Sequence, residues 1–227
     1  MVGASTSIAP AILSGLRNAG IDILATERGR PVHLGHVPDL AFAELDLSRR
    51  SSFDAFAQHN VAEFGKLDIV LFLAGILPGK SLADYTDTKM DEVMEVNFTA
   101  QAALLQRLLP HLNPGAHVLM MASISGERGS FDPIYAASKA AQIAFVKSLA
   151  TWLAPNVRVN ALAPAVIEGS SMYLAMSPER RAYHLAQSPT RRLTTMDELS
   201  GIIVDLCSPA WGNVNGQVIR VNGGVHV

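Results

Sequence analysis

Residues 123–139 read Ser123-Ile-Ser-Gly-Glu-Arg-Gly-Ser-Phe-Asp-Pro-Ile-Tyr135-Ala-Ala-Ser-Lys139, and they lead into an Ala-rich segment, residues 136–152, that predicts a helix. Tyr135 and Lys139 are four residues apart, so on a helix their side chains lie one turn apart on the same face. The apolar run that precedes Ser123 is typical of a buried strand. A strand, a short loop and a long helix in this order are typical of an α/β sheet.

The spacing of Tyr135 and Lys139 puts an ammonium group beside a phenol. A free tyrosine has a pKa of about 10, and a neighbouring cation lowers that pKa because it favours the phenolate. We therefore expect Tyr135 to exchange a proton near neutral pH. Ser123 is expected at the carboxyl end of its strand, where ligands bind in open α/β sheets. Alone, each feature is more often structural, since such pairs are common on helix surfaces and serines are common in turns.

Together, these residues resemble the short-chain dehydrogenase/reductase family, in which a catalytic serine precedes a Tyr-x-x-x-Lys helix by a similar interval. The resemblance covers essentially all 227 residues and includes the ending Gln217-Val-Ile-Arg-Val-Asn-Gly-Gly224. It implies one Rossmann-like dinucleotide-binding and catalytic domain over residues 1–227, with a substrate lid around 168–192. The alternation of helix and strand patterns independently predicts a doubly wound parallel sheet with helices on both faces.

The resemblance also implies an activity, which is reversible hydride transfer between a nicotinamide cofactor and a secondary alcohol or ketone. The positions that match the family's catalytic residues are Asn97, Ser123, Tyr135 and Lys139. Ser123 is expected to hydrogen-bond the substrate oxygen, and Tyr135 to exchange the proton. Lys139 is expected to lower the Tyr135 pKa and to hold the nicotinamide ribose. Asn97 is expected to perturb its helix and to order a relay water.

The N-terminal segment Met1-Val-Gly-Ala-Ser-Thr-Ser-Ile-Ala9 matches the family's phosphate-binding turn, Gly-x-x-x-Gly-x-Gly, with two substitutions. Gly3 is kept, whereas Ser7 and Ala9 replace the second and third glycines. The Ser7 hydroxyl could donate to a phosphate, or its bulk could obstruct one. The helix predicted to follow offers free N–H groups to a pyrophosphate. Little chain precedes Gly3, so the first strand is expected to be a stub unless the chain starts further upstream.

The choice of cofactor is indicated by Glu27, which ends a predicted strand over residues 21–26. An acid at this family position accepts hydrogen bonds from the ribose hydroxyls and repels a 2′-phosphate, so NAD(H) is favoured over NADP(H). Arg28 and Arg30 stand close by and suit a 2′-phosphate, which leaves an NADP(H)-dependent reductase as an alternative. Asp46 and the residue after it match the family's pair beside the adenine, although Asp46 could also cap a helix.

Three further departures from the family lie near the cofactor. Leu73-Ala74-Gly75 lies where the family has Asn-Ala-Gly, so Leu73 replaces the asparagine. We expect this replacement to remove some hydrogen bonding but not the function. Ala165 follows Pro164 where a glycine is usual, and Gly169 stands where a threonine would bind the nicotinamide amide. The full set of expected cofactor-binding residues is Gly3, Ser5, Ser7, Ile8, Glu27, Arg28, Asp46, Leu47, Ala74, Gly75, Tyr135, Lys139, Pro164, Val166 and Ile167.

Composition excludes several other classes of function. The net charge of -2 and the pI near 6.4 argue against a nucleic-acid partner, and the longest apolar run, residues 69–77, is too short to span a membrane. The single cysteine, Cys207, allows no disulfide within the chain, which favours a reducing, cytoplasmic location. His33 and His36 lack further ligands nearby, so no metal site is predicted. The resemblance implies a homodimer or homotetramer.

A second hypothesis is a non-catalytic relative that uses the scaffold for binding or regulation. It is suggested by the departures around the cofactor, which are Ser7, Ala9, Leu73, Ala165 and Gly169. The complete set of four catalytic side chains favours the enzyme instead, acting on a small-molecule alcohol or carbonyl substrate. The sequence does not separate sugar, steroid, acyl and small alicyclic substrates.

Overall fold

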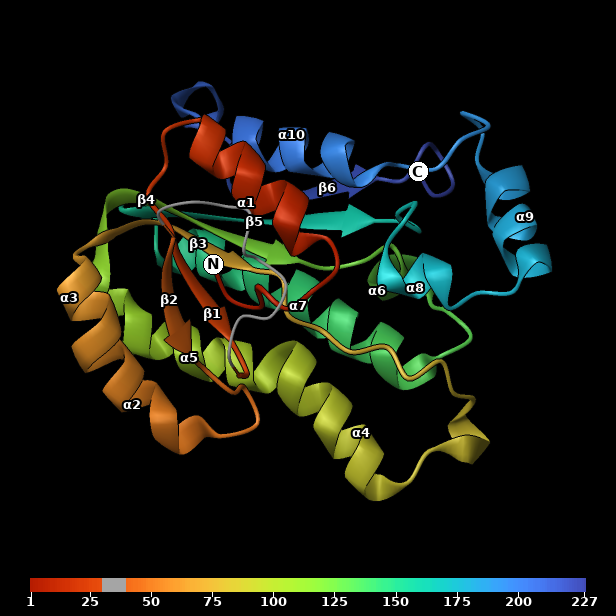
Figure 1. The fold of residues 1–227 in the computed structure, drawn as a ribbon, viewed down its shortest axis with the longest axis horizontal. Helices are drawn as coiled ribbons and strands as arrows, with labels where there is room; N and C mark the ends of the chain where they lie inside the picture. The colour runs from red at the N-terminus through yellow and green to blue at the C-terminus, as the bar shows by residue number, and fades with distance from the viewer. Residues whose placement is uncertain (30–39) are drawn as a thin grey trace.

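The computed structural model describes residues 1–29 and 40–227 and shows a parallel sheet between two layers of helices (Figure 1). The expected crossover loop of residues 29–40, with Arg30, His33 and His36, lies almost entirely outside the described residues. The strands are β1 (Leu24–Glu27), β2 (Ala41–Glu44), β3 (Leu67–Phe72), β4 (Leu112–Met121), β5 (Val157–Pro164) and β6 (Val218–Val221). The α-helices are α1 (Ala9–Asn18), α2 (Phe53–Ala55), α3 (Ala62–Phe64), α4 (Asp87–Met94), α5 (Ala100–Leu108), α6 (Ser125–Arg128), α7 (Pro133–Trp152), α8 (Ser171–Leu174), α9 (Pro178–Gln187) and α10 (Met196–Leu206).

The sheet runs β2-β1 on one side and β3-β4-β5-β6 on the other, and a short N-terminal segment joins the two parts. Val2 forms parallel bridges to both Thr26 and Phe72, and its N–H donates to the Leu71 carbonyl at 2.8 Å. The expected first strand is therefore reduced to one bridging residue. Next to it, a cavity of about 600 Å³ separates β1 from β3 and is lined by apolar side chains that include Leu24 and Ile69.

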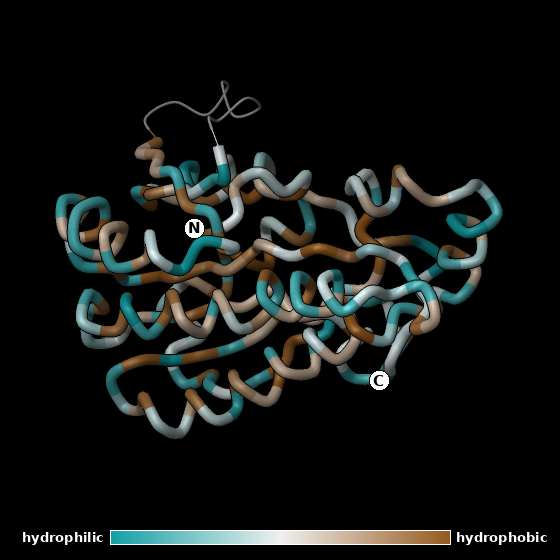
Figure 2. The backbone as a smooth tube through the Cα atoms, turned by 90° about the horizontal axis from the view of Figure 1, so that it is seen from below, coloured by the Kyte–Doolittle hydropathy of each residue, from teal (hydrophilic) through white to brown (hydrophobic). Residues whose placement is uncertain are grey.

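Two apolar clusters cover the two faces of the sheet. On one face, Phe53, Leu104 and Val146 are fully buried and bring the helices around α5 and α7 against the strands. On the other, Ile12 of α1 and Ile203 of α10 are fully buried. Figure 2 shows the hydrophobic segments concentrated inside the molecule, with hydrophilic turns outside. Strands buried on both faces explain why β4 and β5 read as continuous apolar runs.

Two of the predicted helices contain π-helical turns. The predicted helix over 48–64 includes a π-helical turn at Phe56–Val61, and the one over 88–109 includes another at Glu95–Thr99. A π-helical turn inserts one extra residue, which an apolar pattern does not reveal. The second of these turns surrounds Asn97, whose helix was expected to be perturbed. Within the described residues, no helix is long and apolar enough to cross a bilayer.

Candidate active site

A cavity of about 700 Å³ opens at the carboxyl ends of β3, β4 and β5. The start of α1, the segment between β4 and α7, and helices α8 and α9 surround it (Figure 1). The expected site residues that line this cavity are Ser7, Ile8, Gly75, Ser123, Tyr135, Lys139, Pro164, Val166 and Ile167. The structure thus brings the serine, the tyrosine and the lysine to one place, beside the start of a helix.

Tyr135 lies in the first turn of α7, and its side chain is buried next to Ser123. Burial raises the pKa of Tyr135, the Ser123 hydroxyl acts in the opposite direction, and the charge of Asp132 adds to the rise. The expectation that Lys139 lowers this pKa is therefore wrong for the protein without its cofactor. The physical reason is burial, which is the largest influence on the pKa of Tyr135 and outweighs the Ser123 hydrogen bond. The Lys139 ammonium lies 5.7 Å from the centre of the Tyr135 ring and donates its hydrogen bonds to Met121 and Gln142.

Lys139 is 3% exposed and belongs to a buried chain of polar groups. Its ammonium donates to the Met121 carbonyl at 2.7 Å and to Gln142 Oε1 at 3.1 Å. The Gln142 amide then donates to Gln101 Oε1 at 2.9 Å. Burial lowers the pKa of Lys139 to about 7. The lysine is therefore poised to lose its proton near neutral pH.

Asn97 is fully buried, and every polar atom of its amide is bonded. The side chain receives a hydrogen bond from the Ile76 N–H at 2.7 Å and donates to the Ile76 carbonyl at 3.0 Å. It also donates to Ser138 Oγ at 2.9 Å. Asn97 thereby holds the chain just after Gly75 against the turn of α7 that carries Ser138.

Leu73 lacks the amide that the family has at this position, and a different residue supplies one. Leu73 is 4% exposed, and Gln101 donates to the Ala74 carbonyl at 2.9 Å and to the Val96 carbonyl at 3.0 Å. Sequence reasoning missed both Gln101 and Gln142. Each is a glutamine within an apolar helical pattern, where a buried amide needs hydrogen-bond partners, and this was the available signal. Gln101 lies four residues after Asn97.

Asp132 is a third residue that sequence reasoning missed. Its carboxylate is 2% exposed and accepts four hydrogen bonds. Oδ1 accepts from the Tyr135 N–H at 2.9 Å and from the Tyr85 hydroxyl at 2.7 Å. Oδ2 accepts from the N–H groups of Gly79 at 2.9 Å and Lys80 at 3.2 Å. Asp132 caps α7 and ties the wall of the cavity to the helix that carries Tyr135.

The turn before α1 has the features that a dinucleotide pyrophosphate requires. Gly3 has a φ of +96°, and a Cβ atom there would lie 2.6 Å from the Ala74 nitrogen. No side chain caps α1 at Ile8. The Ala9 N–H donates to the Thr6 carbonyl at 3.0 Å and Pro10 has no N–H, so the N–H groups of Ile8 and Ala11 are the ones left without a protein acceptor among the described residues. Thr6, which was not predicted, lines the cavity with Ser7, whereas the exposed Ser5 does not. The residues present fit the diphosphate of a nicotinamide cofactor.

Ser7 contacts the segment that was predicted to be the lid. Its Oγ accepts a hydrogen bond from the Ser171 N–H at 2.8 Å and donates to Ser171 Oγ at 3.2 Å. Ser170, by contrast, uses its hydroxyl within the segment, where it donates to the Ile167 carbonyl and caps α8. Of the two serines after Gly169, only Ser171 therefore presents its hydroxyl to the phosphate turn.

The acids expected at the adenosine end lie at the end of β1 and just beyond β2, which pair in parallel. Glu27 ends β1 and is buried, whereas Arg28 is exposed. Burial acts to raise the pKa of Asp46, but hydrogen bonds from Ser48 and the charges of Arg28 and Arg49 lower it overall. Leu47 is buried in the core. The described residues contain no group of three His, Cys, Asp or Glu side chains that could hold a metal ion.

A doubly wound parallel sheet that carries a Ser-Tyr-Lys set beside an open helix start is the architecture of a dinucleotide-dependent oxidoreductase. The family model described as enoyl-(acyl carrier protein) reductase matches residues 3–226. The chain belongs to the short-chain dehydrogenase/reductase family, as its sequence predicted, and it is an oxidoreductase that uses a nicotinamide cofactor.

Curated relatives cover nearly the whole chain. The 3-oxoacyl-(acyl-carrier-protein) reductase FabG of Vibrio cholerae is 30% identical over 235 residues, which are 100% of this chain and 96% of the relative. Nodulation protein G of Rhizobium sp. is 33% identical over 217 residues, which are 94% of this chain and 85% of the relative. The 2-dehydro-3-deoxy-D-gluconate 5-dehydrogenase of Escherichia coli is 29% identical over 99% of this chain and 93% of its own.

Solved structures of similar chains confirm the fold. A short-chain dehydrogenase/reductase from Brucella melitensis superposes with a TM-score of 0.91 at 29% identity and covers 100% of this chain and 95% of its own. A short-chain dehydrogenase from Burkholderia cenocepacia in complex with NADP superposes with a TM-score of 0.91 at 24% identity. The match covers 100% of this chain and 96% of that one. The predicted fold class is therefore correct.

Proposed function

We propose that the chain transfers a hydride reversibly between a secondary alcohol or ketone and the nicotinamide, with Tyr135 as the residue that exchanges the proton. The observation that carries this proposal is the shared cavity. Ser123, Tyr135 and Lys139 line it together, next to the uncapped start of α1 at Ile8. When bound, the nicotinamide supplies or accepts the hydride, and the protein has to bind the substrate oxygen and move its proton.

Each polar side chain has a distinct proposed role. Ser123 donates a hydrogen bond to the substrate oxygen and stabilises negative charge that develops there. Tyr135 removes the hydroxyl proton in oxidation and returns it in reduction. Lys139 holds the nicotinamide ribose and carries a charge that is sensitive to pH near 7. Asn97 holds the backbone at Ile76 and, as the resemblance implies, orders a relay water.

Binding of the cofactor follows the geometry of the turn and the strand ends. The N–H groups of Ile8 and Ala11 at the start of α1 would receive the pyrophosphate, and residues 164–167 would contact the nicotinamide. Glu27 supports NAD(H), because a buried acid at the end of β1 suits ribose hydroxyls and repels a phosphate. Arg28 keeps NADP(H) as the alternative, and one structural neighbour is in complex with NADP.

The segment 168–192 is proposed to be the substrate lid of a single domain. Helices α8 and α9 lie in it, and Met172 of α8, Met176 between the two helices and Tyr183 of α9 line the cavity. A homodimer or homotetramer is proposed from the resemblance of the C-terminal strand, and β6 lies at the edge of the sheet, where another chain could pack. The substrate is proposed to be a small-molecule alcohol or carbonyl compound.

The experiment that tests the function is a melting-temperature measurement with saturating NADH and, separately, NADPH. A ligand at a hundred times its Kd stabilises the protein by about 2.7 kcal/mol, which corresponds to a shift of several degrees. A shift with NADH alone supports the Glu27 assignment and leads to a turnover screen with secondary alcohols and ketones. A shift with neither would contradict the proposal and would favour a non-catalytic relative.

A further inference from the structure

Three basic side chains gather at one end of the active-site cavity. Arg128 ends α6, and Arg180 and His184 lie on α9; all three line the cavity, and we call them the basic end. Within residues 1–29 and 40–227, neither arginine has a carboxylate within ion-pair distance of its guanidinium. Two arginines from separate elements therefore face one cavity without charge compensation in the part of the chain that the structure describes.

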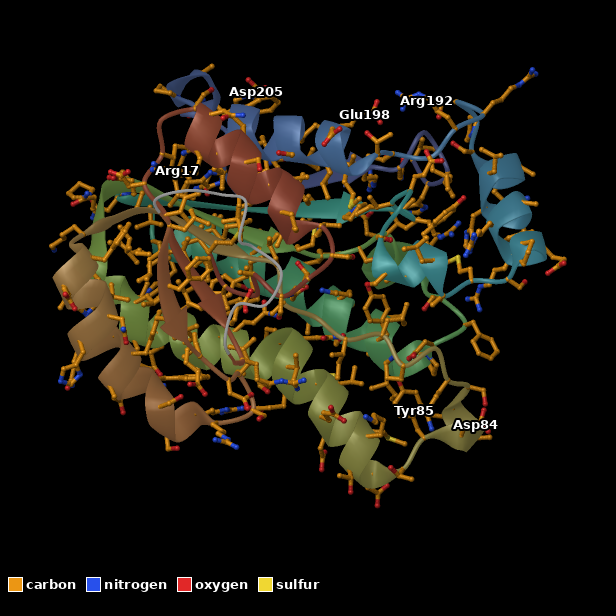
Figure 3. All side chains as sticks on the ribbon, in the orientation of Figure 1. Arg17, Asp84, Tyr85, Arg192, Glu198 and Asp205 are labelled. Atoms are coloured by element: carbon orange, nitrogen blue, oxygen red, sulfur yellow. The ribbon has the colours of Figure 1, made fainter. Side chains whose placement is uncertain are left out.

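Other arginines in the same region are satisfied within the protein. Arg192 pairs with Glu198 at 2.7 Å, and Figure 3 shows the two side chains beside the start of α10. Arg181 donates to the carbonyls of Tyr173 and Leu174 and lies over the Tyr173 ring. Of the three arginines that line the cavity, Arg192 is therefore paired within the protein, whereas Arg128 and Arg180 have no carboxylate partner among the described residues.

The cavity wall also contains little negative charge. Among the described residues that line it, Asp132 is the only acid, and both of its oxygens are occupied by the four hydrogen bonds described above. Asp132 therefore has no free lone pair directed at the arginines with which it could replace a missing partner. The cavity carries an excess of positive charge that an anion would balance.

The basic end lies away from the phosphate turn. Ser171 of α8 contacts Ser7 of that turn, whereas α9 lies at the far right of the molecule in Figure 1, beyond α8. The arginine on α6 comes from the segment between Ser123 and Tyr135, the two residues that are proposed to act on the substrate oxygen and its proton. The charge excess is therefore placed for a substrate rather than for the cofactor diphosphate.

His184 lines the same cavity as the two arginines. Burial lowers the pKa of its imidazole, and the positive charges of Arg180 and Arg128 lower that pKa further. The half-buried ring is then neutral at pH 7 and can donate or accept one more hydrogen bond. The cavity wall also contains the apolar residues Leu77, Phe131, Met172 and Met176.

We propose that the substrate is an anionic carbonyl compound or alcohol, whose carboxylate or phosphate is bound by Arg128 and Arg180 at the end remote from the reacting carbon. This inference rests on the proposed hydride transfer at Tyr135. Guanidinium groups bind carboxylate and phosphate oxygens through paired, charge-assisted hydrogen bonds. An apolar spacer between the anionic group and the reacting carbon of the substrate suits the apolar residues of the wall, among them Met172 and Met176.

The test compares matched ketones with and without the negative charge. The probes are 4-oxopentanoate and 5-oxohexanoate, each beside its methyl ester, with whichever nicotinamide cofactor shifts the melting temperature. We expect kcat/KM for the better acid to exceed that for its ester by about tenfold or more. Arg128→Met and Arg180→Met should each raise KM for the acid by a similar factor, and both should leave KM for the ester unchanged. Arg191→Met, on an exposed lid arginine outside the cavity wall, is the control and should change neither.

Binding of the same probes to the protein–cofactor complex is measured by calorimetry, so that slow turnover does not hide the result. The inference is supported if the acid binds more tightly than its ester and if this difference disappears in Arg128→Met and Arg180→Met. Equal binding and equal kcat/KM for acid and ester would overturn it and leave the proposed function intact, because the esters would still react. A protein that binds neither cofactor would instead contradict the proposed function itself.

Discussion

The backbone N–H of Ser171 donates a 2.8 Å hydrogen bond to Oγ of Ser7, which is 164 residues away in the chain. The contact joins the phosphate turn before α1 to the first helix of the segment 168–192. In the family, a glycine stands at the position of Ser7. In this chain the substitution adds a side chain, and that side chain holds the segment 168–192 against the turn.

We predict that Ser7→Ala loosens this connection. Loss of one hydrogen bond costs about 1 kcal/mol, so hydrogen exchange at the Ser171 amide should accelerate about fivefold. The measurement is residue-resolved exchange by NMR. Ser14→Ala, an exposed serine on α1, is the matched control and should leave the rate unchanged. An unchanged rate in Ser7→Ala would show that α8 is held by its other contacts.

Replacement of the proposed proton donor gives the second prediction. Tyr135→Phe should leave cofactor affinity nearly intact and lower kcat by about two orders of magnitude or more, because the ring is kept and only the hydroxyl is lost. Steady-state kinetics and a melting-temperature shift with cofactor measure the two effects separately. Tyr173→Phe, on the lid segment, should keep normal turnover. Normal turnover in Tyr135→Phe would rule out the assignment of Tyr135.

Asp132 gives the third prediction, because one buried carboxylate holds four donors. Asp132→Ala leaves the N–H groups of Tyr135, Gly79 and Lys80 without this acceptor and should lower the free energy of unfolding by about 3 kcal/mol. Figure 3 shows Tyr85, the fourth donor, in the segment just before α4. Urea denaturation measures the loss, and Asp91→Ala, an exposed acid on α4, should change stability by less than about 0.5 kcal/mol.

A purely structural role for Asp132 can be separated from an effect on Tyr135. The charge of Asp132 contributes to the raised pKa of Tyr135. Asp132→Asn removes that charge but keeps one acceptor oxygen, so the pKa of Tyr135 should fall. The alkaline limb of the pH–kcat profile should then move to lower pH. A profile that does not move would limit Asp132 to capping α7 and supporting the wall.

The fold was predictable from the sequence because its signals are local. Apolar runs gave the buried strands, and the helix that carries Tyr135 and Lys139 lies where its Ala-rich composition placed it, over Pro133–Trp152. The bridging role of Val2 was not predictable in the same way. A single residue between two strands has no periodicity, and its place depends on backbone bonds to segments far along the chain.

The partners of the site residues were harder to predict than the residues themselves. Asn97 was singled out as a polar residue in an apolar helix, but its bonds to Ile76 depend on a π-helical turn that no pattern shows. The amide missing at Leu73 is replaced in space by Gln101, 28 positions later in the sequence. Such replacement is visible only once the helix and the strand end are packed together.

Lys139 gives the fourth prediction, which concerns pH. Its pKa is about 7 in the folded protein and about 10.4 in an unfolded chain. Between these values the unfolded chain holds a proton that the folded protein has released, so this residue makes the free energy of unfolding rise with pH from about 7 to about 10. Each unit of pKa difference corresponds to about 1.4 kcal/mol.

Lys139→Met removes this contribution, so the cofactor-free variant should gain stability over the wild type at pH 6.5 and should lose most of that advantage by pH 9.5. Urea denaturation at several pH values measures both curves, and the exposed Lys147→Met serves as the matched control, with a curve parallel to the wild type. Parallel curves for Lys139→Met as well would mean that Met121 and Gln142 keep the ammonium charged in spite of its burial. In that case the lysine would act as a fixed charge beneath the cofactor, and proton exchange at the site would depend on Tyr135 alone.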